Sequence, residues 1–358
     1  MDGCVLNEEL LPELRWNTHL ACMQKLAQAA GHGLDLADVA GITGLAFRTS
    51  LCREATAAGL HHSYAWEPSF RVWLDALGLD ADLEQHRTEL PCYPGWIERQ
   101  HTQAAACLRR GFPVLFWDNA GFNLVIGERD GRYLAGPMPA QLAHPIWASE
   151  QRAERFLART TLEWKSDREP VELERDELTP VLDHDAFCGY IHGVPRFDRE
   201  SALTGGLWAA AAELLGKIEF PRFMDDFTHV FEPRFGTVAL ARLLGELKLS
   251  QVNPFGLILF VQSQAEARRL GKRWLDRVIS LVDPQYKGRL EQAAEFLERI
   301  IRYWQPACAA YSPPLDEKQQ MLPSRLETCR EAVYQVMQTE NTMGRLLVGV
   351  VREMFDPS

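Results

Sequence analysis

Cysteine and histidine are the side chains of this sequence best suited to covalent chemistry. The chain of 358 residues contains eight cysteines and ten histidines. A cysteine becomes a nucleophile when a nearby imidazole or a helix N-terminus stabilises its thiolate. The candidates for such a pair are Cys22, Cys52 or Cys92 as the nucleophile and His19, His61 or His62 as the base. Any of these pairs would indicate a cysteine-dependent acyltransferase or amide hydrolase.

The first candidate cysteine lies in a stretch with a clear helical pattern. Asn17 or Thr18 is a suitable N-cap, because its side-chain oxygen can accept from the free amides of the first turn. Apolar residues follow at three- and four-residue steps, at Leu20, Met23, Ala27 and Ala30. Gly31 and Gly33 are typical of a helix C-terminus. Cys22 falls one turn inside the helix on its apolar side, which favours packing over catalysis, and Thr18 is favoured as a cap over a nucleophile.

The residues after this helix predict a second, short helix at 36–40, which starts behind Asp35 and stops at Gly41. The two helices are expected to form the first layer of an α/β unit. Arg48, which follows Phe47 in the next tight connection, is a candidate anchor for a ligand carboxylate. An ion pair with one of the many acidic residues of the chain is the favoured role for Arg48.

From residue 113 onward the pattern alternates with a period of two. Short β-rich runs at 113–117, 123–126 and 133–135 predict three strands, and Asp130-Gly131 between the last two is a strong signal for a tight hairpin. Strands joined in this way are antiparallel. Two further runs are expected to add an edge pair to the sheet, at 161–165 and 171–173.

Two stretches of the sequence, 17–48 and 111–137, resemble papain-like proteins of bacteria. The similarity is to bacteriocin-processing cysteine peptidases and to the N-terminal domain of butirosin-type acyltransferases. In those families a nucleophilic cysteine starts the first helix, and an Ala-Cys pair and a glycine follow it. A strand bearing a histidine and an Asp-Pro hairpin complete the signature.

Matching the Ala21-Cys22 pair to this signature places Thr18 where the resemblance implies the nucleophile. Gly121 or Phe122 then stands at the histidine position, and Gly136, before Pro137, stands at the aspartate position. The resemblance therefore implies a papain-like α+β domain that lacks all three catalytic residue types. The helical C-terminal half agrees with the acyltransferase-like relatives, in which a helical region also follows.

Such a domain would keep its cleft and bind a peptide, a carrier-bound acyl group or a partner protein, in a pathway that makes a peptide or an antibiotic. The residues expected to line the cleft are Asn17, Thr18, His19, Arg48, His61, His62, Trp66 and Phe122. The stretch 61–68 reads as an aromatic, histidine-rich loop, although a surface loop with one docked tryptophan is the more common arrangement. The alternative is an active cysteine acyltransferase or amide hydrolase with a relocated nucleophile.

Beyond residue 200 the pattern is helical. Apolar residues recur at helical spacing in stretches separated by prolines, at 203–218, 237–248, 264–282, 290–304 and 324–355. They predict a helical bundle with a buried stripe formed by Phe296, Leu297, Ile300 and Ile301. Residues 179–200 show no clean period and are expected to link a papain-like α+β domain at 1–178 to a helical domain at 201–358.

Composition narrows the functional classes. The net charge is −11, and no cluster of Lys and Arg is present, which argues against binding to nucleic acid or to an anionic membrane. No stretch approaches the roughly twenty apolar residues of a membrane span, and the acidic N-terminus is unlike a signal peptide, so the cytoplasm is the expected compartment. The cysteine spacing indicates neither a zinc site nor a disulfide framework, and no metal or cofactor is expected. A homo-oligomer is left open.

Overall fold

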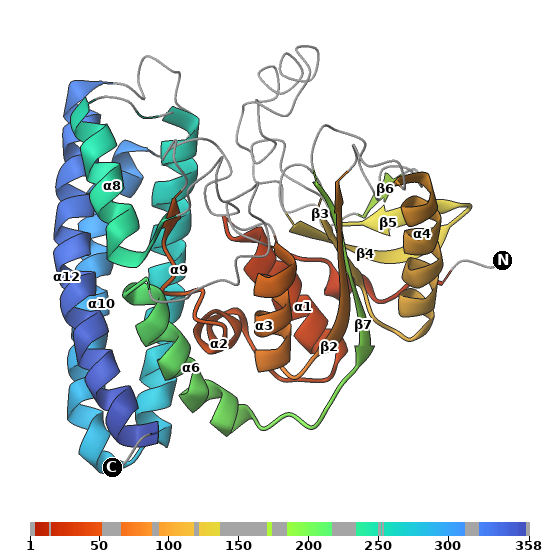
Figure 1. The fold of residues 1–358 in the computed structure, drawn as a ribbon, viewed down its shortest axis with the longest axis horizontal. Coiled ribbons are helices and arrows are strands. Elements are labelled where there is room, and N and C mark those ends of the chain that lie inside the picture. Colours follow the sequence, from red (N-terminus) through yellow and green to blue (C-terminus); the bar gives the residue numbers. More distant parts are fainter. Residues whose placement is uncertain are drawn as a thin grey trace. The chain divides into compact units, whose positions relative to one another are not determined.

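The computed structural model describes residues 4–13, 16–51, 66–87, 93–117, 122–136, 170–173, 185–216, 234–249, 252, 254–311 and 322–355. The chain divides into two compact units, and each combines two separate stretches of sequence. The first, which we call the sheet unit, comprises Met1–Asp35 and Trp66–Phe197. The second, the helical unit, comprises Leu36–Ala65 and Asp198–Ser358. Figure 1 shows the elements of each unit.

A mixed α/β arrangement with an antiparallel sheet forms the sheet unit. In spatial order, the strands that the structure describes are β2 (Asp80–Arg87), β7 (Asp185–Gly193), β3 (Val114–Trp117), β4 (Phe122–Arg129), β5 (Arg132–Ala135) and β6 (Val171–Leu173). Every neighbouring pair is antiparallel. The three central strands predicted from the sequence are β3, β4 and β5, so their antiparallel pairing is confirmed. The run 171–173 forms the edge strand β6, whereas 161–165 lies outside the described residues.

The hairpin between β4 and β5 forms where the Asp-Gly signal predicts it. Arg129 pairs with Arg132, which leaves Asp130 and Gly131 as a two-residue loop. Both loop residues have positive φ, 52° and 80°, and a tight turn of this kind requires that conformation at both central positions. The predicted hairpin is therefore confirmed.

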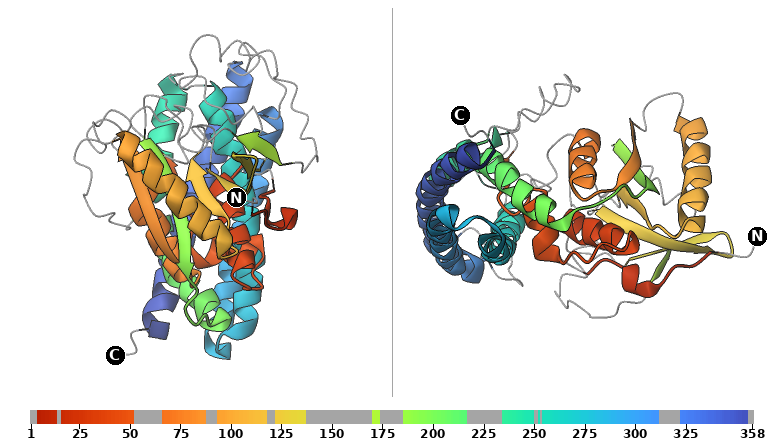
Figure 2. Two further views of the ribbon diagram at one scale, coloured as in Figure 1. Left: turned by 90° about the vertical axis from the view of Figure 1, so that its right-hand side faces the viewer. Right: turned by 90° about the horizontal axis from the view of Figure 1, so that it is seen from below.

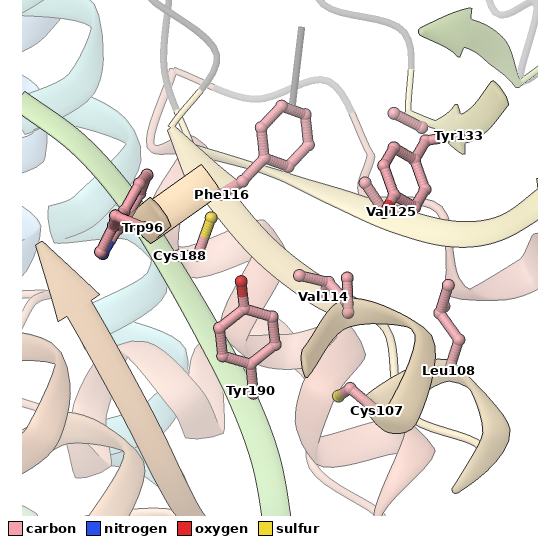
Figure 3. Packing of buried hydrophobic residues seen from close by; sticks show 11 residues of the cluster. Trp96, Cys107, Leu108, Val114, Phe116, Val125, Tyr133, Cys188 and Tyr190 are labelled. Carbon is pink, nitrogen blue, oxygen red and sulfur yellow. The ribbon is translucent and has the colours of Figure 1, made fainter. Parts of the chain in front are cut away.

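Helices cover both faces of the sheet. In Figures 1 and 2, α4 (Tyr93–Arg109) lies on one face, and α1 (Thr18–Ala29) and α3 (Trp66–Ala76) lie on the other. The core beneath α4, shown in Figure 3, is made of Trp96, Ala104, Cys107, Leu108, Val114, Phe116, Val125, Tyr133, Ala135, Cys188 and Tyr190. The helix α3 begins at Trp66, so the expected loop is wrong for residues 66–68. Pro68 is compatible with this helix because the first-turn amides have no helical partner.

The strand β7 corrects the expected linker at 179–200. β7 is an interior strand of the sheet, between the edge strand β2 and β3. Phe187, Cys188, Tyr190 and Ile191 are all buried, because both faces of this strand are covered. A strand buried on both faces loses the alternation of apolar and polar residues by which strands are recognised, and its sequence therefore resembled an irregular linker.

The helical unit is built from long helices. They are α6 (Arg199–Leu214), α8 (Gly236–Leu249), α9 (Pro254–Leu281), α10 (Pro284–Ala310) and α12 (Pro323–Phe355). Figure 2 shows α10 beside α9 and α12, and the helical character of this half is confirmed. In the predicted stripe, Leu297 and Ile300 are buried, whereas Phe296 and Ile301 are half-buried. No helix in the described part of the chain is long and apolar enough to cross a membrane.

The short helix α2 (Leu36–Ile42) belongs to the helical unit, and not to the first layer of the α/β unit as expected. It packs against α9 through glycine: a Cβ on Gly41 would lie 2.0 Å from the Trp274 ring. After α2 the chain forms β1 (Ser50–Leu51), which pairs antiparallel with β8 (Arg234–Phe235). The expected domain at 1–178 is therefore interrupted by residues 36–65, which belong to the helical unit. The sequence analysis missed this interruption because the contact between Gly41 and Trp274 joins residues far apart in the chain.

Because Gly41 lies against the Trp274 ring, we predict that the methyl group of an alanine at position 41 lowers the stability of the protein. Gly41→Ala should lower the free energy of unfolding by ~1–3 kcal/mol or more, because the new Cβ overlaps a buried ring. Gly288→Ala, in α10, is the matched control: nothing lies within 4 Å of the position that a Cβ would take there, and alanine should be neutral or stabilising by up to ~1 kcal/mol. Urea unfolding of both variants checks this. Equal stabilities would show that Trp274 moves aside freely.

Candidate functional site

The N-terminus of α1 meets the first residue of β4. The Thr18 hydroxyl oxygen accepts a hydrogen bond from the Phe122 N–H at 3.0 Å, although 104 residues separate the two in sequence. Asn17 is the N-cap by position, but its side chain makes no capping hydrogen bond. The Thr18 hydroxyl accepts its hydrogen bond from the strand β4. The expected side-chain cap is therefore wrong. The contact brings together the positions at which the resemblance implies the nucleophile and the base, although Gly121 lies outside the described residues.

The third position, Gly136, lies beside the same strand. The Asn123 side-chain amide donates to the Gly136 carbonyl at 2.8 Å, and the Gly136 N–H donates to the Leu124 carbonyl at 3.1 Å. A Cβ on Gly136 would lie 2.7 Å from the Asn123 Oδ1 and 2.9 Å from the Pro12 Cδ. Any side chain at this position would therefore collide with its neighbours. Asn123 was missed from the sequence, although a lone Asn inside the apolar run FNLVI was a usable signal.

Phe122 contributes its ring to an aromatic cluster. Its ring centroid lies 4.6 Å from that of Phe70, 5.0 Å from that of Trp117 and 5.5 Å from that of Trp66. Trp66, a predicted cleft residue, is buried in the same cluster and lies 4.7 Å from Trp117. Trp117 itself is half-buried. The structure thus gathers Thr18, Phe122 and Trp66, three of the predicted residues, at one end of the sheet.

The surroundings of His19 and Cys22 do not favour the predicted catalytic pair. His19 is buried and stacks on Trp73 of α3, with ring centroids 6.0 Å apart. Cys22 is completely buried, and burial raises the pKa of its thiol well above the ordinary value. A raised pKa keeps the thiol protonated, which is the opposite of what a nucleophile requires. The other candidates Cys52, Cys92, His61 and His62 lie outside the described residues.

Other cysteines show the same effect of burial. Burial raises the pKa of Cys107 to about 11 and that of Cys188 to about 12. The pKa values of Cys308 and Cys329 are also raised by burial. Within the described ranges, no group of three or more His, Cys, Asp or Glu side chains is arranged to hold a metal ion. The arrangement around Thr18 offers a hydroxyl, an aromatic ring and a glycine, which supports packing and binding better than proton transfer.

Arg48, another predicted cleft residue, belongs to the helical unit and makes the ion pair that the sequence analysis favoured. Its Nη1 lies 3.3 Å from the Glu213 Oε1, and both side chains are buried. The Arg48 guanidinium also lies over the Phe235 ring, 5.1 Å from its centroid. Arg48 is therefore a structural residue of the helical unit, whereas Thr18 and Phe122 belong to the sheet unit.

A second buried arginine, Arg268, was missed from the sequence. Its Nε donates to Glu340 at 2.6 Å, its Nη1 to the Ala46 carbonyl at 2.8 Å, and its Nη2 to the Thr49 hydroxyl at 2.8 Å. The signal was available: Arg268 lies seven residues from Val261 and from Leu275, and Glu340 lies seven from Val333 and from Leu347. Those four apolar residues are buried. A charge at such a position on an apolar stripe indicates a buried ion pair.

Thr18 yields the first prediction from this region. Thr18→Val keeps the shape of the side chain but removes the acceptor for the buried Phe122 N–H. The unfolding free energy should fall by ~1–3 kcal/mol, because an unsatisfied buried amide retains its desolvation penalty. Thr18→Ser keeps the hydroxyl and should lose less. Chemical denaturation of both variants measures the difference, and a serine variant as unstable as the valine variant would mean that the hydrogen bond contributes little.

Glu213 predicts a pH dependence of stability. Burial raises the pKa of Glu213 above its ordinary value of 4.5, although the neighbouring Arg48 and Arg268 lower it. Because its pKa is raised, Glu213 binds its proton more tightly in the folded state than in the unfolded state. Protonation of Glu213 therefore stabilises the fold. This stabilisation is complete below pH 4.5 and is lost as the pH rises through the raised pKa. Glu213→Gln removes the titration. The unfolding free energy of the wild type minus that of Glu213→Gln should therefore decrease with rising pH across this window.

Urea titrations from acidic to neutral pH measure this difference. Glu291→Gln, an exposed change in α10, is the control and should leave the pH profile of the wild type unchanged. A constant difference between the wild type and Glu213→Gln at every pH would contradict the assignment.

Comparison with known proteins adds no family to these observations. No protein-family profile matches the sequence, and no curated protein matches it significantly. The resemblance to papain-like proteins therefore rests on the two stretches of sequence, 17–48 and 111–137, alone.

Proposed function

We propose that the sheet unit is a papain-like domain without catalytic residues, which binds a peptide, a carrier-bound acyl group or a partner protein. The observation that carries this proposal is the hydrogen bond between the Phe122 N–H and the Thr18 hydroxyl. It joins the start of the first helix to the start of the strand on which the resemblance implies the base. A cysteine enzyme of this kind needs its nucleophile and base within hydrogen-bond reach.

The side chains at these positions account for the loss of chemistry in the proposal. The hydroxyl of Thr18 accepts from a backbone amide, and the ring of Phe122 is packed among aromatic residues. A carboxylate at position 136, which would be needed to orient an imidazole, has no space there, because Asn123 and Pro12 occupy the place of its Cβ. Binding does not require these groups. Apolar contacts from aromatic residues such as the half-buried Trp117 are sufficient for recognition of an apolar chain.

The alternative is an active acyltransferase or amide hydrolase with a relocated nucleophile. The raised pKa values of Cys22, Cys107 and Cys188 weigh against those three thiols. Cys52 and Cys92 remain the candidates for this alternative, and a chemical test separates the two functions.

Alkylation of the native protein with iodoacetamide near neutral pH tests the proposal. We expect slow labelling of Cys22, Cys107, Cys188 and Cys329, because a buried thiol of raised pKa is mostly protonated, and we expect no cysteine to react at the fast rate of an activated thiolate. Peptide mapping by mass spectrometry assigns the rate at each of the eight cysteines, and labelling in denaturant shows that each of them can react. One cysteine that reacts far faster than the others in the native protein would favour the enzyme.

Binding is tested with defined probes: decanoyl-pantetheine for a carrier-bound acyl chain, and an array of apolar peptides. We expect binding of at least one probe without turnover, and a several-fold weaker affinity for Trp117→Ala. Trp208→Ala is the control, since Trp208 is an exposed tryptophan of α6 in the helical unit. Release of free pantetheine from the thioester would overturn the non-catalytic function.

A further inference from the structure

The strands β3 and β4 differ in length, and this leaves part of one edge of β4 without a neighbouring strand from the sheet. β3 pairs with β4 only over Phe122–Val125. Pro113, which precedes β3, has no N–H with which to continue the ladder. On the opposite edge, β5 continues its pairing along β4 to Arg129. The half of β4 from Ile126 onward therefore offers backbone groups on the side that β3 has left.

The N-terminal residues of the chain take the place that β3 leaves. The Leu6 N–H donates to the Ile126 carbonyl at 2.8 Å, and the Glu128 N–H donates to the Cys4 carbonyl at 3.0 Å. Val5 forms an antiparallel bridge with Gly127. We call residues 4–12 the N-terminal arm. The arm adds a short strand to the free half of β4, which is the arrangement by which many domains bind an extended peptide.

Side chains and glycine adapt this part of the sheet to the arm. Leu11 is buried against Ile126 and Leu134, and Leu6 and Leu10 pack on the same cluster. The Lys25 ammonium of α1 donates to the Glu9 carbonyl at 2.7 Å. A Cβ on Gly127 would lie 2.9 Å from the Cys4 carbonyl oxygen and from the Val5 Cα, so only glycine lets the two backbones approach. The surface is therefore shaped for this sequence.

We propose that this surface of β4 also receives the N-terminal arm of a second copy of the chain, so that two sheet units exchange arms in a reciprocal dimer. The Cys4 thiol of the arm also donates to the Leu108 carbonyl of α4 at 3.5 Å. The contacts of the arm are thus with α1, α4, β4, β5 and Gly136, all of which belong to the sheet unit. An arm from a second copy can make every one of these contacts. Exchange of an identical element has a low free-energy cost for this reason. This inference does not depend on the proposed function.

The sequence of the N-terminal arm indicates that the occupant of this surface of β4 is a second copy of the chain. The surface fits a backbone that passes Gly127 closely and places leucines where Leu6, Leu10 and Leu11 lie, and a second copy carries the same residues. Because exchange adds no contact that the closed monomer lacks, the dimer should become populated only as the protein concentration rises.

A cross-linking experiment on the full chain tests the exchange. Cys4 and Glu128 lie opposite each other in the bridge, so a cysteine at position 128 is placed to form a disulfide with Cys4. One protein carries Cys4→Ser with Glu128→Cys, and the other is the wild type, which supplies Cys4 on its arm. The two are mixed at high concentration and oxidised with diamide, and mass spectrometry identifies the disulfide between Cys4 and residue 128. We expect a covalent heterodimer through this pair.

The matched control replaces Glu128→Cys with Arg129→Cys. Neighbouring residues of a strand point to opposite faces, so this variant should give several-fold less heterodimer. An excess of a synthetic peptide of residues 4–13 should reduce the heterodimer by competing for β4. Leu11→Asp in the wild-type partner should also reduce it, because the arm loses its buried anchor, and circular dichroism verifies that this variant is folded.

Two results would overturn the exchange. The first is a heterodimer no more abundant than with Arg129→Cys, while Glu128→Cys alone forms its disulfide with Cys4 inside the monomer. The second, independent of any disulfide geometry, is a wild-type molar mass by light scattering that stays at the monomer value at every concentration. A mass that rises with concentration and returns to the monomer value on addition of the arm peptide would support the exchange.

Discussion

The buried guanidinium of Arg268 is the interaction on which the organisation of the helical unit depends. A buried arginine must have its donors satisfied, since a desolvated charge without partners is strongly destabilising. Here α12 supplies Glu340, and the segment after α2 supplies the Ala46 carbonyl and the Thr49 hydroxyl. The guanidinium therefore holds a segment from the first fifth of the sequence against two helices from its end. These hydrogen bonds are among the contacts that join the stretch beginning at Leu36 to the helical unit.

Arg48 and Glu213 form a second ion pair in the helical unit. Their ion pair is buried, and Thr49 donates to Gln264 at 3.0 Å. Together with the pairing of β1 and β8, these contacts connect residues 46–51 to α6, α8, α9 and α12. Arg48, a candidate ligand anchor in the sequence for which an ion pair was favoured, is thus part of a polar core. Such a core specifies one arrangement of the segment, because any other arrangement leaves charges unpaired in the interior.

Burial also decides the chemistry of the sheet unit. A thiol in an apolar core is a small hydrophobic group, and Cys22, Cys107 and Cys188 behave in this way. At one end of the sheet, the Thr18 hydroxyl accepts from the Phe122 N–H, and the Asn123 side chain donates to the Gly136 carbonyl. Pro12 of the N-terminal arm lies at the same corner. The arm and the proposed binding region are therefore neighbours within one unit.

Local signals in the sequence were sufficient for those elements whose pattern is set by neighbours in the chain. The helix from Thr18, the strands β3 to β5, the Asp130-Gly131 hairpin and the helices of the C-terminal half all follow from periodicity and turn chemistry. The papain-like resemblance also implies that Thr18, Gly121 or Phe122, and Gly136 are related positions, and this stays a prediction. The hydrogen bonds from Phe122 to Thr18 and from Asn123 to Gly136 are compatible with that relation.

Features that depend on distant partners were decided only by the tertiary structure. The strand β7 lacked alternation because both of its faces are covered, and α2 joined the helical unit because Gly41 fits Trp274. Arg48 and Arg268 became structural residues because Glu213 and Glu340 lie 165 and 72 residues away in sequence. Periodicity records which face of an element is buried, but not what buries it. The amino-acid sequence by itself therefore determined the elements that carry a periodic pattern or a turn signal, and long-range packing and charge pairing decided the strand β7 and the unit that each element joins.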